Sequence, residues 1–234
     1  MLTKLVMDSI GRKNSLDSLR TYFGTTTWTA QPYTGAYFDT FASCQNDLAT
    51  AYKITAEDLV SVSFLSVHVP PMAARGILQN RADEISALLK NIDPQLQIQS
   101  VTEATHDSVF GPGSPAQKLW SILRGKKDGG WDVGPTITSK IMARKRPHLI
   151  PIWDSVLKSV TGQPDDRNQW NIWRQEMARS GDLLEFLEGV RQEAGVPEIP
   201  LLRVLDVILW MSGQGKLHSE AEPSIRQLSS EPAR

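Results

Sequence analysis

The sequence predicts an all-α fold, and three observations support this prediction. Apolar residues recur at helical spacing through most of the chain, and residues typical of helix starts precede several of these segments. No convincing alternation of apolar and polar residues indicates a sheet. The chain has 234 residues, of which 40% are hydrophobic and 22% charged, so it can bury an ordinary globular core.

Helix-start signals locate the first predicted helices. Thr55 followed by Asp58 is typical of a helix start, although the Val- and Ser-rich stretch after it leaves a strand as the alternative. A proline pair at 70–71 precedes a second helix, and Ser114 with Pro115 is an N-cap followed by proline at the first helical position. With the apolar periodicity, these signals predict helices over residues 72–79, 82–92 and 116–123.

The C-terminal half contains the remaining predicted helices, over residues 135–145, 165–179, 182–194 and 200–211. The last of these is apolar along its whole length, which indicates that it is buried. From Ser212 onward Gly, Ser, Glu, Pro and Gln dominate. We therefore expect one helical domain over residues 1–212 and a disordered tail over residues 213–234.

The composition argues against several classes of protein. No apolar run is long enough to cross a bilayer, and the N-terminus lacks a signal-peptide core, so we expect a cytoplasmic protein without a membrane partner. The single cysteine, Cys44, rules out an intramolecular disulfide. The four histidines show no metal-ligand spacing, so we expect no metal. Because the formal charge is −1, any nucleic-acid site must come from a local basic patch.

The stretch from Trp131 to Leu157 contains most of the chemical signal. A Val-Gly turn opens a helix there, and free amides at a helix N-terminus form a suitable phosphate site. The helix ends in a basic run before Pro147, and an apolar segment then leads to Asp154 at the head of another helix. An acid at a fixed distance from a phosphate site can be placed beside the sugar of a bound nucleotide.

This stretch resembles the helix-hairpin-helix superfamily of DNA glycosylases, which includes endonuclease III and the 3-methyladenine glycosylases. Residues 132–134 correspond to the Gly-Val-Gly hairpin of that family, and residues 152–155 to the segment with its catalytic aspartate. The spacing from Gly134 to Asp154 agrees with the family without a gap, and the resemblance covers residues 114–160. It implies two helical lobes with a cleft between them, double-stranded DNA with a flipped base as the substrate, and no cofactor.

The resemblance also implies roles for individual residues. Asp154 would be the catalytic carboxylate, which stabilises the oxocarbenium-like sugar or orients the attacking water. Contacts to the DNA backbone would come from Val133, Gly134, Thr136, Lys140, Arg144 and Arg146, with Lys126 and Lys127 of the hairpin approach joining the same face. The flipped base would lie against Tyr33, Asp39 and Trp153.

Two departures from the family refine the expectation. Thr136 stands where the bifunctional members have a nucleophilic lysine, so a Schiff-base lyase step is not expected. Asp132 replaces the first hairpin glycine, which brings a carboxylate to the phosphate site and a side chain to a position that tolerates positive φ. The expected function is that of a monofunctional DNA N-glycosylase that excises a damaged or modified base, in repair or in defence against phage with modified DNA.

Simpler interpretations stay open beside this one. Asp154 is also a good N-cap, the basic run can be a solvated helix C-terminus, and the early aromatic residues can be core. The alternatives are a non-catalytic helix-hairpin-helix nucleic-acid-binding protein and a structural or partner-binding helical protein that does not bind DNA. The wider chain, through residues 33–35, 57–60 and 143–151, resembles an actinobacterial family of unknown function, which implies no activity and no obligate protein partner.

Overall fold

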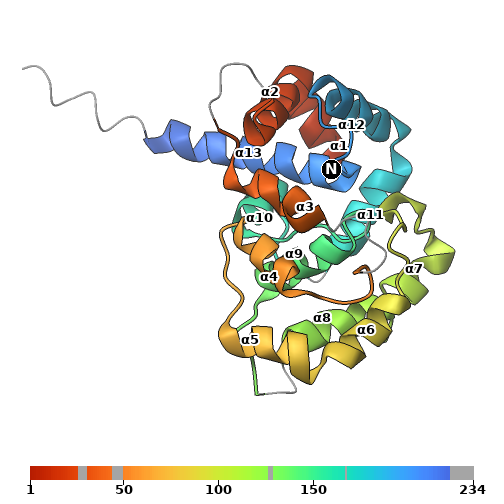
Figure 1. Ribbon diagram of the computed structural model, residues 1–234. Coiled ribbons are helices and arrows are strands. Elements are labelled where there is room, and N and C mark those ends of the chain that lie inside the picture. Colours follow the sequence, from red (N-terminus) through yellow and green to blue (C-terminus); the bar gives the residue numbers. More distant parts are fainter. Residues whose placement is uncertain (26–30, 44–49, 126–128, 167, 222–234) are drawn as a thin grey trace, which may run out of the picture.

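A computed structural model describes residues 1–25, 31–43, 50–125, 129–166 and 168–221, the side chains of 43 and 216–221 excepted. Every regular element in these ranges is a helix, so the all-α prediction is confirmed (Figure 1). Within the same ranges, no helix combines the length and the hydropathy needed to cross a bilayer.

The helices follow one another along the chain with short connections. The elements are α1 (Leu2–Lys4), the π-helical η1 (Leu5–Ile10), α2 (Gly11–Phe23), η2 (Thr34–Ala36), α3 (Tyr37–Thr40), η3 (Phe41–Ser43), α4 (Ala56–Ser63), α5 (Pro71–Arg75), the π-helical η4 (Gly76–Asn80), α6 (Ala82–Lys90), η5 (Ile98–Ser100), α7 (Glu103–Val109), α8 (Pro115–Leu123), α9 (Pro135–Lys145), α10 (Ser155–Thr161), α11 (Gln169–Arg179), α12 (Gly181–Glu193) and α13 (Leu201–Ala221).

Side-chain caps explain where several of these helices begin. At the start of α4, the Thr55 hydroxyl accepts a hydrogen bond from the amide of Asp58, and the Asp58 carboxylate accepts one from the amide of Thr55 at 2.9 Å. This reciprocal capping box specifies a helix locally, so the alternative strand after Thr55 is wrong. Ser114 caps α8 in the predicted way, and α9 has the predicted bounds.

The predicted disordered tail is wrong for residues 212–221, because α13 continues to Ala221. Gly213 is buried against α10, and a Cβ atom there would lie 2.5 Å from Val156 and 2.6 Å from Val160. The glycine thus permits close helix packing at a place where composition indicated disorder. Residues 222–234 lie outside the described part of the chain. Two helices, α2 and α7, lie where the sequence analysis makes no prediction.

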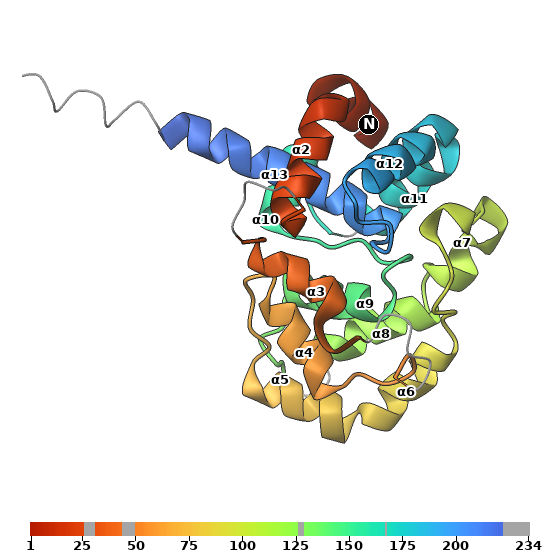
Figure 2. The same ribbon diagram turned by 45° about the horizontal axis from the view of Figure 1, so that its top comes forward.

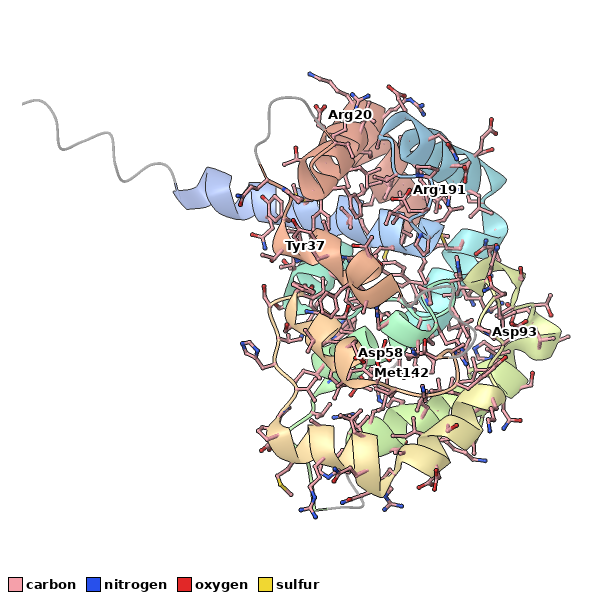
Figure 3. The ribbon with its side chains drawn as sticks, viewed as in Figure 1. Arg20, Tyr37, Asp58, Asp93, Met142 and Arg191 are labelled. Carbon is pink, nitrogen blue, oxygen red and sulfur yellow. The ribbon has the colours of Figure 1, made fainter. Side chains whose placement is uncertain are left out.

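The two longest-range packing arrangements place the site. Helix α13 packs against α2, α10 and α12, while α9 packs against α4 and α8 (Figures 1 and 2). The buried side chains of α13 include Val204, Leu205, Val207, Ile208 and Leu209, all with no exposed surface, which confirms the predicted burial of that helix. Figure 3 shows the contrast between interior and surface: Met142 is 1% exposed, whereas Tyr37 is 48% exposed.

Candidate functional site

A cavity of about 400 Å³ lies where α9, the head of α10 and α13 meet the segments around residues 33–35 and 64–67. This volume is in the range of ligand pockets, about 300–1,000 Å³. Its lining combines aromatic and ionisable side chains, among them Tyr22, Tyr33, Lys140, Asp154, Arg203, Asp206 and Trp210. The structure therefore brings together residues that are distant in the sequence, including the predicted catalytic acid.

Asp154 is both a helix cap and a cavity residue. Its Oδ1 accepts a hydrogen bond from the amide of Leu157 at 2.9 Å, which caps α10, and its side chain is half-buried. Among the described residues, no other donor is hydrogen-bonded to this carboxylate, so its second oxygen is available in the cavity. The capping and catalytic interpretations of Asp154 are thus geometrically compatible.

The segment before Asp154 is held in place by side chains from two other helices. The hydroxyl of Ser139, on α9, accepts a hydrogen bond from the amide of Trp153 at 2.9 Å. The Gln169 side chain, on α11, donates to the carbonyl of Ile152 at 2.5 Å. These two bonds fix the backbone next to Asp154 and so orient its carboxylate toward the cavity.

Replacing Ser139 with alanine should therefore perturb both stability and the acid. Ser139→Ala leaves the buried amide of Trp153 without a partner, so we expect a loss of about 1–3 kcal/mol of unfolding free energy, measured by denaturant titration. Ser121→Ala is a matched control, because the Ser121 hydroxyl also bonds a carbonyl on its own helix but is exposed. Equal stability of the two variants would show that the bond to Trp153 contributes nothing.

Lys140 lies in the cavity and not on the outer surface, which corrects its predicted role in gripping a DNA backbone. Its side chain is 4% exposed, and its Nζ donates to the carbonyl of Leu65 at 2.9 Å. Burial lowers the pKa of Lys140, and the nearby Asp154 and Asp206 carboxylates oppose this effect. A partly desolvated amine thus lies close to the two acids.

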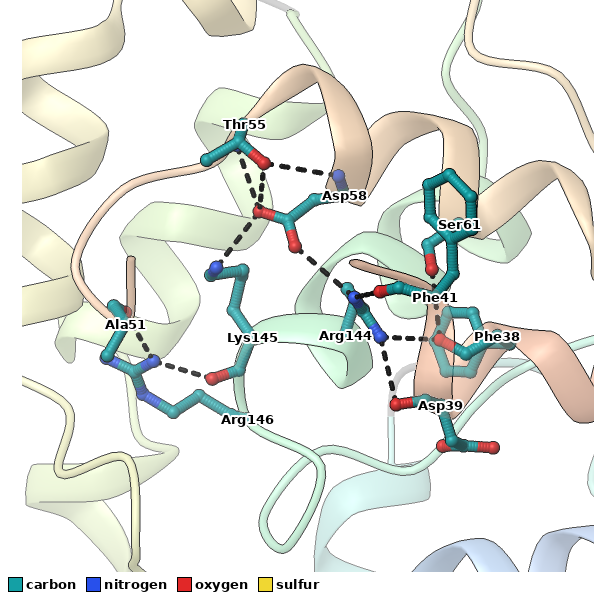
Figure 4. A network of polar contacts seen from close by, with 10 residues as sticks. All are labelled: Phe38, Asp39, Phe41, Ala51, Thr55, Asp58, Ser61, Arg144, Lys145 and Arg146. Atoms are coloured by element: carbon teal, nitrogen blue, oxygen red, sulfur yellow. Dashed lines mark hydrogen bonds and ion pairs between the residues drawn. The ribbon is translucent and has the colours of Figure 1, made fainter. Parts of the chain in front are cut away.

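Arg144 and Arg146 also lie inside the protein, so the prediction that they contact DNA is corrected as well (Figure 4). The Arg144 guanidinium donates to the carbonyl of Phe38 at 2.6 Å and forms an ion pair with Asp58 at 3.3 Å. Arg146 donates to backbone carbonyls, including that of Ile92 at 2.9 Å. Because α9 is a central helix, its basic residues satisfy carbonyls of the surrounding elements instead of facing solvent.

Asp58 neutralises this interior cluster. Its two oxygens receive Arg144 and Lys145, the latter at 2.9 Å, and all three side chains are at most 3% exposed (Figure 4). The same carboxylate closes the capping box with Thr55. One buried acid therefore joins α4 to the C-terminal end of α9, directly behind the cavity.

The hairpin residues before α9 have the geometry expected of a glycine-rich turn. Asp132 is exposed and has φ of 55°, in the left-handed region where the related family has glycine. Gly134 is the N-cap of α9, and no side chain caps it among the described residues. Thr136 lines the cavity, whereas Val133 is 6% exposed and has only its backbone to offer. The predicted contacts of Lys126 and Lys127 lie outside the described residues.

The predicted base pocket is correct in one residue out of three. Tyr33 lines the cavity, where its ring stacks on Tyr22 at 5.5 Å and meets the Trp210 ring edge-on at 5.9 Å. Asp39 does not line this cavity: it is 4% exposed, pairs with Arg203 at 3.0 Å and faces a smaller neighbouring cavity. Trp153 is 7% exposed and packs inside the protein. Asp39 and Trp153 are therefore corrected as base-pocket residues.

Sequence reasoning missed the contribution of α13. Arg203, Asp206 and Trp210 all line the cavity, although the helix was interpreted only as apolar and buried. An arginine and an aspartate three residues apart, inside an otherwise apolar helix, were the available signal, because buried charges need partners and cluster at functional sites.

The comparison with known proteins identifies a family without a described activity. Residues 15–213 match a family described as of unknown function (DUF6308). The chain belongs to this family. The matched segment contains every residue that lines the cavity except Gln214. Neither a curated protein nor a solved structure matches the chain.

Proposed function

We propose that this protein is a monofunctional DNA N-glycosylase that excises a damaged or modified base, with Asp154 as the catalytic carboxylate. The observation that carries the proposal is the geometry of Asp154: one oxygen is held by the α10 amide, and the other is available in a cavity lined by Tyr33 and Trp210. A base flipped out of a duplex needs such an aromatic pocket next to an acid.

In the proposed reaction, the bond between the sugar and the base breaks, and the base departs with the bonding electrons. The sugar becomes oxocarbenium-like, and the carboxylate of Asp154 stabilises its positive charge or orients the attacking water. The hydrogen bond from Leu157 holds the carboxylate in one orientation, so little reorganisation is needed as the charge develops. Water supplies the oxygen that replaces the base, and no cofactor takes part in the proposed step.

The arrangement of the helices supports a glycosylase-like fold with two lobes. Helices α2, α12 and α13 pack together, α4, α8 and α9 form a second packed group, and the cavity has lining residues from both groups. The turn between α8 and α9 corresponds to the hairpin of the resemblance, and α9 leads from this turn to the segment before Asp154. The direct test is incubation with duplexes that carry lesions or modified bases, followed by alkali treatment and gel analysis of strand breaks at abasic sites.

We expect no lyase step through Thr136. Because a threonine hydroxyl cannot form an imine with the sugar aldehyde, borohydride should trap no enzyme–DNA adduct at this position. The measurement is reduction in the presence of an abasic duplex, followed by peptide mapping. An adduct at Lys140, which lies in the same cavity, would contradict the monofunctional assignment.

The inward position of the basic residues favours a second candidate, the hydrolysis of a free nucleoside or nucleotide by the same acid. Arg144 and Arg146 are buried, and the exposed carboxylate of Asp132 repels phosphate at the hairpin, so the grip on a duplex is weaker than the sequence indicates. Salt-dependent binding of a duplex supports the first candidate. Release of a base from free nucleosides, without duplex binding, supports the second.

A further inference from the structure

One face of α13 forms a wall of the cavity. The residues of α13 that line it recur at helical spacing, and they are Arg203, Asp206, Val207, Trp210 and Gln214. Side chains with this spacing lie on one side of a helix. Asp206 is therefore on the cavity side of α13, one turn before the aromatic ring of Trp210.

The carboxylate of Asp206 is held through one oxygen only. Arg203 pairs with Oδ2, and the same guanidinium donates to Asp39 at 3.0 Å and to the Tyr22 hydroxyl at 2.7 Å, so it cannot turn away. The other oxygen of Asp206, Oδ1, is buried and has no hydrogen-bond partner among the described residues. Buried acceptors without a partner are rare in folded proteins, and this one belongs to a side chain that lines a cavity.

We propose that Asp206 recognises the polar edge of the ring that occupies the cavity, and that it selects an amino-substituted base over its oxo counterpart. The identity of the occupant as a base rests on the proposed function. An ionised carboxylate can only accept hydrogen bonds. An exocyclic amino group gives Oδ1 the donor that it lacks, whereas a carbonyl oxygen at the same place sets acceptor against acceptor.

The charge state of Asp206 makes this selectivity pH-dependent. The titratable groups around it are Arg203 on α13, Lys140 on α9, Asp154 at the head of α10, Tyr22 on α2 and, across Arg203, Asp39 on α3. Burial raises the pKa of Asp206 to about 6, with Arg203 opposing this effect and Asp154 adding to it. Near neutral pH Asp206 is mainly an acceptor, and at lower pH its proton lets it donate to a carbonyl.

Two pairs of rings that differ only by an amino or an oxo group test the proposal. Cytosine is compared with uracil, and adenine with hypoxanthine, by ligand-detected NMR titration of the full chain near neutral pH. We expect the amino member of each pair to bind roughly tenfold or more tightly, as is typical when a hydrogen bond to a charged group replaces an unpaired contact. Equal affinities, tighter binding of the oxo member, or no binding of any of the four rings would overturn the proposal.

The variant Asp206→Asn should invert the preference. Because Arg203 only donates, the asparagine oxygen must face it, which places the amide NH₂ where Oδ1 lies in the native protein. The wall then presents a donor, so the oxo rings should bind more tightly. The control Asp39→Asn changes a partner of Arg203 outside this cavity and should keep the amino preference. An Asp206→Asn variant that still prefers the amino rings would contradict the proposal.

A pH series with the unaltered protein covers the case in which Asp206→Asn does not fold, which circular dichroism would show. The amino preference should shrink as the pH falls through about 6, and a constant preference would overturn the role of Asp206. Base release from duplexes tests Asp154 separately. Ring selectivity without base release would contradict only the proposed function, and base release without ring selectivity only the role of Asp206.

Discussion

The Asp154→Asn variant should lose base release by roughly a hundredfold or more while it keeps its affinity for the substrate, because it lacks the charge that stabilises the oxocarbenium-like sugar. Asparagine is a good N-cap, so the bond from Leu157 and the start of α10 should survive the change. The measurement is the single-turnover rate of base release, compared with substrate affinity under the same conditions.

The alanine variant separates the two roles of Asp154. Asp154→Ala removes the cap as well as the charge and should cost about 1 kcal/mol of unfolding free energy, whereas Asp154→Asn should be nearly neutral in stability. Equal loss of activity in both variants, with a stability loss only in alanine, is the expected pattern. If Asp154→Asn retains a near wild-type rate, Asp154 is only a cap, and Asp206, the other acid of the cavity, becomes the next candidate.

Asp58→Ala should cause the largest loss of stability in the chain, about 3–5 kcal/mol, because it leaves Arg144 and Lys145 buried without their counter-ion. For a chain of this size, each kcal/mol corresponds to about 2–4 °C of melting temperature. Thermal unfolding followed by circular dichroism measures the effect. Because Asp58 also closes the cap with Thr55, Asp58→Asn should recover part of the capping contribution but none of the charge.

The neighbouring acid provides a matched control for Asp58. Glu57 is exposed and lies in the same first turn of α4, so Glu57→Ala should change stability by less than about 0.5 kcal/mol. A small effect of Asp58→Ala, comparable to that of Glu57→Ala, would show that the interior cations find other partners. In that case the bonds of Arg144 to backbone carbonyls, such as that of Phe38, are sufficient.

Local signals in the sequence predicted most of the helices for a physical reason. The start of α8 depends on Ser114 and Pro115, and that of α4 on the reciprocal bonds of Thr55 and Asp58, all within a few residues. The same reasoning failed where composition alone was used, since Gly213 belongs to a packed helix and not to a disordered tail. A glycine that permits close packing and a glycine that favours disorder look alike until the neighbouring helix is known.

The sequence by itself determined the all-α class, the helix caps and the position of Asp154 at the head of a helix, because these depend on contacts between residues close in the chain. Only the tertiary structure decided which way the charged side chains face. It placed Arg144 and Arg146 inside the protein, and it brought Asp206 from α13 to the same cavity as Asp154. These outcomes depend on how α4, α9 and α13 pack, and the spacing of charges along one helix does not specify the partner helix that will bury them.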